Sequence, residues 1–159
     1  MSRRGKTVIR KINPDPVYKS KVLTKLINRA MFDGKKSVAQ KEVYKAFDII
    51  KEKTGEEPLK VFTKGIENIK PIMEVRPRRV GGAAYQIPMT VKGPRRESLA
   101  IRWLLVAANS RPNTEYRTFA EKLAAEILDA VNGEGVAMKK KSDVEKMAEA
   151  NRAFAHFRW

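Results

Sequence analysis

The amino-acid sequence predicts a mainly α fold: a six-helix, bundle-like domain with a protruding two-stranded β-hairpin arm and an extended basic N-terminal tail. Two observations lead to this prediction. Apolar residues recur with helical spacing in six segments, and the segment around Gly81-Gly82 instead alternates between apolar and polar residues. A length of 159 residues suits one domain, so we expect a tail over residues 1–16 and a single helical domain over residues 17–159.

The first 16 residues have no helical period and are interrupted by Pro14 and Pro16, which predicts an extended segment. Asp15 is the only acidic residue in it, and the basic residues are Arg3, Arg4, Lys6, Arg10 and Lys11. Such a tail can simply aid solubility. A polycationic tail can, however, wrap a phosphate backbone at a small cost in free energy, so we favour contact with nucleic acid.

Three helices joined by short loops are expected next. The first starts after Ser20, a residue that suits the N-cap, and ends at residues 33–34. The second is expected to open at the capping-box pattern of residues 37–40 and to end at Gly55, and the third begins near Pro58. The side chains expected to face the core are Val22, Leu23, Leu26, Ile27, Ala30, Met31, Val43, Phe47, Ile50, Leu59, Phe62, Ile66 and Ile69.

Residues from about 72 to 91 have the alternating pattern of two β-strands, with Gly81-Gly82 as the tight turn between them. Pro77 and Pro88 cannot donate hydrogen bonds to a neighbouring strand, so neither strand can lie inside a wide sheet. We therefore expect a two-stranded arm that adds little to the core. About eight residues per strand at ~3.3 Å each make it on the order of 25 Å long.

Three further helices are predicted after the hairpin. The fourth spans residues 95–109 and is apolar on almost all sides, which predicts the buried centre of the domain, with Trp103 in the core. The fifth spans about residues 115–131. The last is expected to open at the capping-box pattern of residues 142–145 and to run toward Ala155.

The composition argues against several classes of function. Cysteine is absent, which excludes disulfides and thiolate metal sites, and the only histidine is His156. No Gly-rich phosphate loop or metal-spaced cluster occurs, so we expect no enzyme, no cofactor and no metal. No segment approaches ~18 uncharged apolar residues, and the basic N-terminus leads into no apolar signal segment. The cytoplasm is therefore the expected location, without a membrane partner.

A formal net charge of +16 is the dominant feature of the sequence. Such a charge on a small domain attracts polyanions, and nucleic acid is the commonest of these. Besides the tail, the candidate RNA-binding residues are Lys35, Lys36, Arg76, Arg78, Arg79, Tyr85, Arg95, Arg96, Arg102, Lys139, Lys140 and Lys141. For the arm, arginine forks can grip phosphates and an exposed Tyr85 can stack on an unpaired base. Plain solvation explains the two lysine clusters about as well.

The start of the fourth helix carries Arg95 and Arg96 in its first turn and Arg102 seven residues later. Cations at a helix N-terminus oppose the helix dipole, whereas an anion bound there removes that penalty. We therefore interpret this helix start as an RNA site. On this hypothesis, replacing Arg95 and Arg96 with glutamine leaves the free protein equally stable or slightly more stable.

Four motifs resemble those of the bacterial small-subunit ribosomal protein seven family. They are residues 33–37 (DGKKS), 78–88 (RRVGGAAYQIP), 99–104 (LAIRWL) and 147–159 (MAEANRAFAHFRW). They occur in order and with matching spacing, and the resemblance runs from the basic tail to Trp159. Pro77 departs from the family pattern, which has a small polar residue at this position.

The resemblance implies six helices with a protruding β-ribbon, and direct binding to the 3′ major domain of the small-subunit rRNA, where the family nucleates assembly of the head. It also implies exit-site tRNA and mRNA near the ribbon, neighbouring head and platform ribosomal proteins, and for some members their own mRNA. Carried onto this chain, the rRNA-facing residues are the tail, Lys35, Lys36, the ribbon arginines and Arg95, Arg96 and Arg102.

Two other classes of function are considered. A DNA architectural protein also combines helices with a basic β-arm, usually as a symmetric dimer, but the sequence shows no additional apolar face for a dimer. A preference for structured RNA over duplex DNA distinguishes the two. An RNA-modifying enzyme is disfavoured because the sequence has no catalytic constellation.

Overall fold

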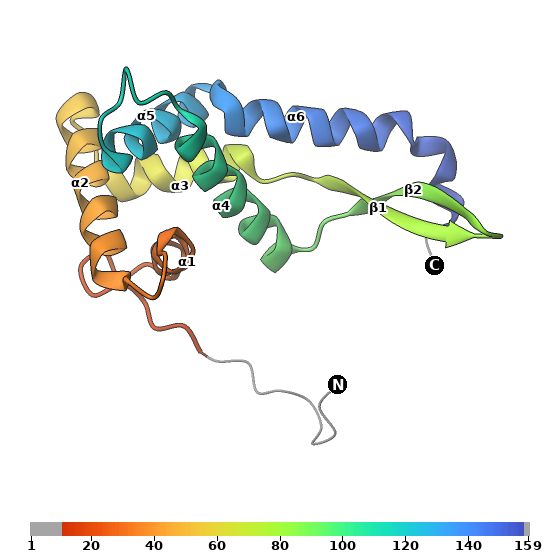
Figure 1. The fold of residues 1–159 in the computed structure, drawn as a ribbon, viewed down its shortest axis with the longest axis horizontal. Helices are drawn as coiled ribbons and strands as arrows, with labels where there is room; N and C mark the ends of the chain where they lie inside the picture. Colours follow the sequence, from red (N-terminus) through yellow and green to blue (C-terminus); the bar gives the residue numbers. More distant parts are fainter. Residues whose placement is uncertain (1–10, 158–159) are drawn as a thin grey trace.

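The computed structural model describes residues 11–157, so the tail residues Arg3, Arg4, Lys6 and Arg10 lie outside the described part of the chain. Its elements are α1 (Lys21–Ala30), α2 (Lys36–Thr54), α3 (Pro58–Ile69), β1 (Met73–Val80), β2 (Ala83–Thr90), α4 (Gly93–Ser110), α5 (Phe119–Asn132), α6 (Gly135–Ala150) and the 3-10 helix η1 (Arg152–Phe157). Figure 1 shows α1–α5 gathered at one end of an elongated molecule, while the two strands extend toward the other end. The predicted mainly α fold with a two-stranded hairpin is confirmed.

Helix α5 forms the centre of the helical body, because it contacts α2, α3, α4 and α6. Its inner face includes the small side chains Ala120, Ala124 and Ala130, all fully buried, which allow neighbouring helices to approach closely. One close approach is at Gly65 of α3, where a Cβ atom would lie 3.3 Å from the backbone oxygen of Ile127.

The prediction that the fourth helix forms the buried centre is wrong. Helix α4 buries Leu104 and Ala108 against its neighbours but exposes Arg102 and Val106 to solvent. Trp103 is half-buried and packs against the edge of the core. Helices α1, α3, α5 and α6 contact α4, and one of its faces still remains uncovered.

The second helix begins differently from the prediction. It starts at Lys36, its N-cap is Lys35, and no side chain caps it, so the predicted capping box at Ser37 does not form. The preceding turn directs the chain into the helix instead, because Asp33 and Gly34 adopt left-handed φ angles of 52° and 73°. Aspartate and glycine are among the residues that tolerate this region best.

The last long helix, α6, begins at Gly135, and the predicted capping box at Ser142 lies within it. Its first turn is held by Glu126 of α5, whose Oε1 accepts a hydrogen bond from the backbone N–H of Ala137 at 2.9 Å. The same buried carboxylate accepts hydrogen bonds from Arg111 at 2.8 and 2.6 Å. A tertiary contact therefore replaces the local cap that the sequence pattern predicted.

Helix α5 starts at Phe119 rather than near residue 115 because a capping box forms at Thr118. The Thr118 hydroxyl oxygen accepts from the Glu121 N–H at 3.2 Å, and the Glu121 carboxylate accepts from the N–H groups of Arg117 and Thr118 at 2.8 and 3.4 Å. These backbone hydrogen bonds, with that of Arg117 the strongest influence, lower the pKa of Glu121. The threonine and glutamate three residues apart were a local signal that the sequence analysis missed.

The hairpin has an unbroken antiparallel register from Met73 opposite Thr90 to Val80 opposite Ala83, and Pro77 pairs with Gln86 without a bulge. Gly81 and Gly82 form the predicted turn with φ angles of 58° and 89°. Two consecutive positive φ angles are typical of the type I′ turn, which matches the twist of the strands.

Among the described residues, none from the hairpin belongs to the main hydrophobic cluster, in agreement with an arm that adds little to the core. Ile87 and Val91 are buried, and α6 lies along both strands. Helix η1 then folds onto β2, as Figure 1 shows. The arm is therefore a two-stranded ribbon supported along its length by the C-terminal segment.

The folded body begins before the predicted boundary at residue 17, because Asp15 is buried. Its carboxylate accepts hydrogen bonds from the backbone N–H groups of Val17 and Tyr18 at 3.2 and 3.1 Å. The Tyr44 hydroxyl of α2 donates to the same carboxylate, with oxygen distances of 3.0 and 2.9 Å. These contacts fix the point at which the tail leaves the body.

We expect Tyr44→Phe to lower the free energy of unfolding by about 1.5–3 kcal/mol, because a buried carboxylate loses a hydrogen-bond donor. Urea denaturation at pH 7 measures this change. The matched control is Tyr85→Phe, whose hydroxyl has no hydrogen bond among residues 11–157 in this structure and whose removal should change stability by less than ~0.5 kcal/mol. Equal effects of the two substitutions would contradict the assignment of Asp15 to the folded body.

The stability difference between the wild type and Tyr44→Phe should depend on pH in the alkaline range. Burial, followed by the negative charges of Asp48 and Asp15, raises the pKa of Tyr18, and burial raises that of Tyr44. A raised pKa means that the neutral phenol stabilises the fold below pH ~10 and that this contribution is lost as the pH rises through the higher folded-state value. The stability difference between wild type and Tyr44→Phe should therefore shrink above pH ~10 in pH-dependent urea melts. A constant difference would contradict it.

Candidate RNA interface

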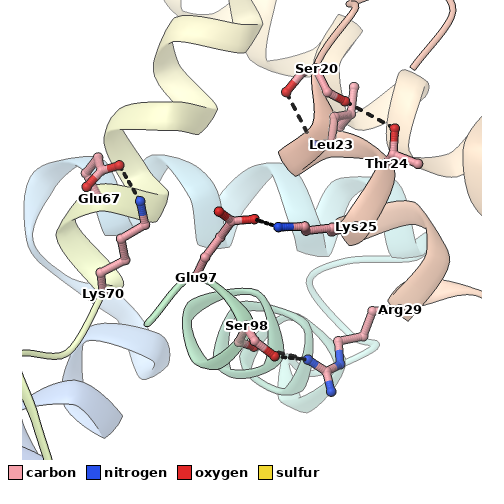
Figure 2. Close-up of polar contacts among 9 residues, drawn as sticks. All are labelled: Ser20, Leu23, Thr24, Lys25, Arg29, Glu67, Lys70, Glu97 and Ser98. Atoms are coloured by element: carbon pink, nitrogen blue, oxygen red, sulfur yellow. Dashed lines mark hydrogen bonds and ion pairs between the residues drawn. The ribbon is translucent and has the colours of Figure 1, made fainter. Parts of the chain in front are cut away.

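Helix α1 presents a row of cations on its solvent face. Lys21, Lys25 and Arg29 follow one another at four-residue spacing, while Leu23 and Ile27 point into the core. The helix is anchored at its start by Ser20, whose hydroxyl oxygen accepts a hydrogen bond from the backbone N–H of Leu23 (Figure 2). From the sequence, only a buried face is predicted for this helix. Its basic row at i, i+4 and i+8 was the signal that this prediction missed.

Two polar contacts join α1 to the start of α4. The Lys25 ammonium lies 2.7 Å from Glu97 Oε1, and Arg29 Nη1 donates to the backbone oxygen and hydroxyl of Ser98 at 3.1 and 3.0 Å. Figure 2 shows both side chains reaching from α1 across to α4. The carboxylate and the serine thus orient two cations along the same side of the body.

A groove of about 500 Å³ lies between α1 and the start of α4. Lys25, Asn28 and Arg29 line it from α1, and Pro94 and Ser98 line it from α4. Cations and amides along an open groove are the side chains that contact phosphate and sugar groups of a nucleic acid.

The first residues that the structure describes, at the end of the tail, reach this groove. Ile12 lines it, and Lys11, Lys21 and Lys25 surround a neighbouring hollow of about 470 Å³. Lys11 therefore lies beside the cations of α1 and adds to the same positive surface.

The arginines at the start of α4 have partners within the protein. Arg95 Nε donates to both carboxylate oxygens of Glu74 on β1 at 2.8 Å, and Arg76 donates to the same carboxylate at 2.6 Å. Arg96 Nε donates to the backbone oxygen of Pro71 at 2.9 Å. Glu74 is buried, and these cations compensate for the loss of water around its carboxylate.

This arrangement corrects the hypothesis that Arg95 and Arg96 destabilise the free protein. The opposing helix dipole acts on Arg95, but the Glu74 carboxylate compensates for it. One carboxylate shared by two arginines still leaves a positive excess, and the side chains of Arg95 and Arg76 are about half exposed, at 51% and 47%. They can therefore hold Glu74 and meet an external phosphate at the same time. Arg102 lies seven residues after Arg95 on α4 and is exposed.

Near the tip of the arm, Arg79 is exposed and Arg78 is half-buried opposite Tyr85. Tyr85 is not free to stack on a base as predicted, because its ring centroid lies 5.2 Å from that of Phe154 and 5.5 Å from that of Phe157. The tyrosine fastens η1 to β2. Its neighbours are aromatic residues of the C-terminal motif.

The lysines of α6 form a separate surface. Lys139 and Lys140 are exposed, whereas Lys141 Nζ donates to the backbone oxygen of Asn68 at 2.7 Å. That oxygen belongs to the last turn of α3, where carbonyl groups lack helical partners. Among the described elements α6 does not contact α1, and Figure 1 shows it on the opposite side of the molecule from α1.

The structure therefore gathers part of the predicted set. Lys25 and Arg29 line the groove, and Lys11 lines the neighbouring hollow with Lys21 and Lys25. Arg95 and Arg76 meet at Glu74, outside the lining of the groove. Lys35 and Lys36 are exposed in the turn before α2. Within residues 11–157, no group of acidic or histidine side chains is arranged to hold a metal ion, and no helix is long and apolar enough to cross a membrane.

Known proteins resemble this chain over its whole length. Residues 2–152 match the family described as ribosomal protein S7p/S5e. The chain is 59% identical over 159 residues to small ribosomal subunit protein uS7 of Carboxydothermus hydrogenoformans and 60% identical over 159 residues to that of Caldicellulosiruptor saccharolyticus, with 100% of both chains covered in each case. It is 58% identical over 157 residues to the protein of the same name from Thermotoga petrophila, with 99% of each chain covered. The chain therefore belongs to the ribosomal protein S7 family, as its sequence motifs predicted.

Proposed function

We propose that this protein binds the 3′ major domain of the small-subunit rRNA directly, nucleates assembly of the head, and places its β-hairpin arm near the exit-site tRNA and mRNA. Membership of the family makes it a structural, non-enzymatic protein of the small ribosomal subunit, located with that subunit in the cytoplasm. Its other partners are the neighbouring head and platform ribosomal proteins, and its own mRNA is a further candidate ligand.

One observation carries the proposal of direct rRNA binding. Lys25 and Arg29 of α1 line one open groove together with the start of α4, although the two helices are far apart in the sequence. Lys11 of the tail lines the neighbouring hollow with Lys21 and Lys25. Lys25 is oriented by Glu97 and Arg95 by Glu74, so both ammonium and guanidinium groups are held in place before any ligand binds. Preorganised cations bind a phosphate backbone with a smaller loss of side-chain entropy.

The remaining proposed RNA contacts are Arg3, Arg4, Lys6, Arg10, Lys35, Lys36, Arg78, Arg79, Arg96, Arg102, Lys139 and Lys140. We assign Tyr85 and Lys141 mainly structural roles, since each is engaged inside the protein. A DNA architectural role is less well supported. Such proteins often insert an exposed apolar wedge from the arm into the minor groove, whereas Ile87 is buried at the base of this arm.

Binding to rRNA should weaken steeply with salt. With ~6–10 phosphates neutralised, the slope of log affinity against log salt should be roughly −5 to −9. Arg102→Gln should reduce the magnitude of this slope by about 0.7–0.9 and change the stability of the free protein by less than ~0.5 kcal/mol, because this side chain is exposed. Filter binding at several salt concentrations and thermal melts measure both effects.

Arg95→Gln is the informative companion to this variant. It should reduce the slope by a similar amount and also destabilise the free protein by about 1 kcal/mol, because Glu74 keeps only one of its two arginine partners. A wild-type slope near −1 would contradict a broad electrostatic interface. Loss of stability without any change in binding would make Arg95 purely an internal ion-pair partner.

The arm can be shortened without disturbing its register. Removing residues 78–80 and 83–85 joins Pro77 and Gln86, which already pair, through the same Gly81-Gly82 turn. Because the buried Ile87 and the Glu74 contacts remain, the helical body should stay folded and rRNA affinity should fall less than about tenfold. Chemical footprints of exit-site tRNA and mRNA on reconstituted subunits should change instead. Unchanged tRNA and mRNA footprints would contradict the placement of the arm.

A further inference from the structure

Among the phenylalanine, tyrosine and tryptophan rings of residues 11–157, Phe32 is the only exposed one, with 73% of its surface accessible. The other rings of these three types in this part of the chain are buried or half-buried, including Tyr85, which the sequence had suggested as a stacking surface. A large exposed aromatic ring is unfavourable in water unless a ligand covers it.

The backbone holds Phe32 in this position. The N–H of Lys35 donates to the backbone oxygen of Phe32 at 2.9 Å, which closes a tight turn between α1 and α2. The two central residues, Asp33 and Gly34, have φ angles of 52° and 73°. The turn therefore fixes where the Phe32 side chain leaves the surface, and little backbone order has to be gained when a ligand binds.

Phe32 borders an apolar pocket of about 280 Å³, here called the Phe32 pocket. It is lined by Met31 and Phe32 from the turn, by Lys35 and Val38 from the start of α2, and by Asn109 and Phe119 from α4 and α5. The volume is close to the lower limit of small-ligand sites, ~300 Å³. Asn109 contributes an amide, a group that can donate to and accept from the edge of a base.

The charge around the pocket favours an anionic partner. Lys35 and Lys36 are exposed and form no ion pair with another of the described residues, whereas the acidic Glu42 at the pocket wall is paired with Lys45 at 3.0 Å. Asp33 is the remaining acid in the turn, so the two lysines leave a positive excess. Such a rim attracts phosphate and disfavours the basic extensions that another RNA-binding protein would offer.

The pocket is continuous with the proposed rRNA interface. Arg95, Arg102, Val106 and Asn109 lie at helical spacing on α4, and Arg102, Val106 and Asn109 are exposed along its uncovered face. This face leads from the arginine cluster at the start of α4 to Asn109 at the pocket. A strand bound by the arginines can therefore follow α4 to the Phe32 pocket.

We propose that the Phe32 pocket receives one unpaired base of the rRNA, stacked on the Phe32 ring, with Asn109 at the base edge and Lys35 or Lys36 at the adjoining phosphate. This proposal rests on the proposed function and adds a site for recognition of a single-stranded base. Unpaired bases commonly stack on aromatic side chains in RNA-binding proteins, and the stacking is independent of the salt-sensitive phosphate contacts.

The test compares Phe32→Ala, Phe32→Leu and Phe32→Trp with the wild type in binding to small-subunit rRNA. Phe32→Ala should weaken binding by about 5- to 150-fold, the range for loss of one stacked base, and leave the salt slope unchanged. Phe32→Trp should retain affinity because it keeps an aromatic face. Phe32→Leu should behave like Phe32→Ala, since it keeps apolar volume but offers no ring for stacking.

Chemical probing of the rRNA bases supplies the second readout. Wild-type protein and Phe32→Trp should protect one unpaired base that is left accessible in the Phe32→Ala complex, while the other protections remain. Val136→Ala is the matched control, because Val136 is an exposed apolar residue of α6, outside the pocket, and its replacement should alter neither readout. Thermal melts of all variants should coincide, as Phe32 is exposed.

The outcomes separate the two proposals. Failure of the wild type to bind rRNA contradicts the proposed function. If the wild type binds rRNA and Phe32→Ala binds it equally well, the stacking site alone is overturned. Equal affinities of Phe32→Leu and Phe32→Trp overturn it too. Normal rRNA binding by Phe32→Ala combined with loss of a neighbouring protein from reconstituted subunits also overturns it, since the pocket would then bind a protein.

Discussion

The buried carboxylate of Glu74 is the interaction on which the relation between arm and body depends. A carboxylate removed from water needs charged partners, and here Arg76 comes from the same strand while Arg95 comes from the first turn of α4. The pairing draws the base of the hairpin and the start of α4 together. It also places two half-exposed guanidinium groups side by side, so the contact that stabilises the fold also shapes its basic surface.

Two further acids act in a similar way. Glu97 orients Lys25 between α1 and α4, and Glu126, fully buried in α5, binds Arg111 and the first turn of α6. Burial opposes the charge of Arg111, but hydrogen bonds to Asp129 and Glu126 outweigh it, so the pKa of Arg111 is raised. Each of these carboxylates is paired at a junction between elements. These three carboxylates are thereby engaged inside the protein.

The C-terminal segment explains why a two-stranded arm can persist in water. An isolated hairpin is marginally stable, because each strand has only one neighbour. Here α6 lies along both strands, and the rings of Phe154 and Phe157 enclose Tyr85 on β2. These aromatic contacts therefore stabilise the arm.

The sequence by itself determined the helical class, the hairpin and the positive charge, since these depend on local patterns. Gly81-Gly82 is an example, because its two positive φ angles strongly favour glycine. Only the tertiary structure decided the partners of Arg95 and Tyr85 and the start of α6. Arg95 meets a carboxylate 21 residues away, and α6 is capped by Glu126 from another helix. Such contacts are set by how helices pack, so neither spacing nor local charge in the sequence could show them.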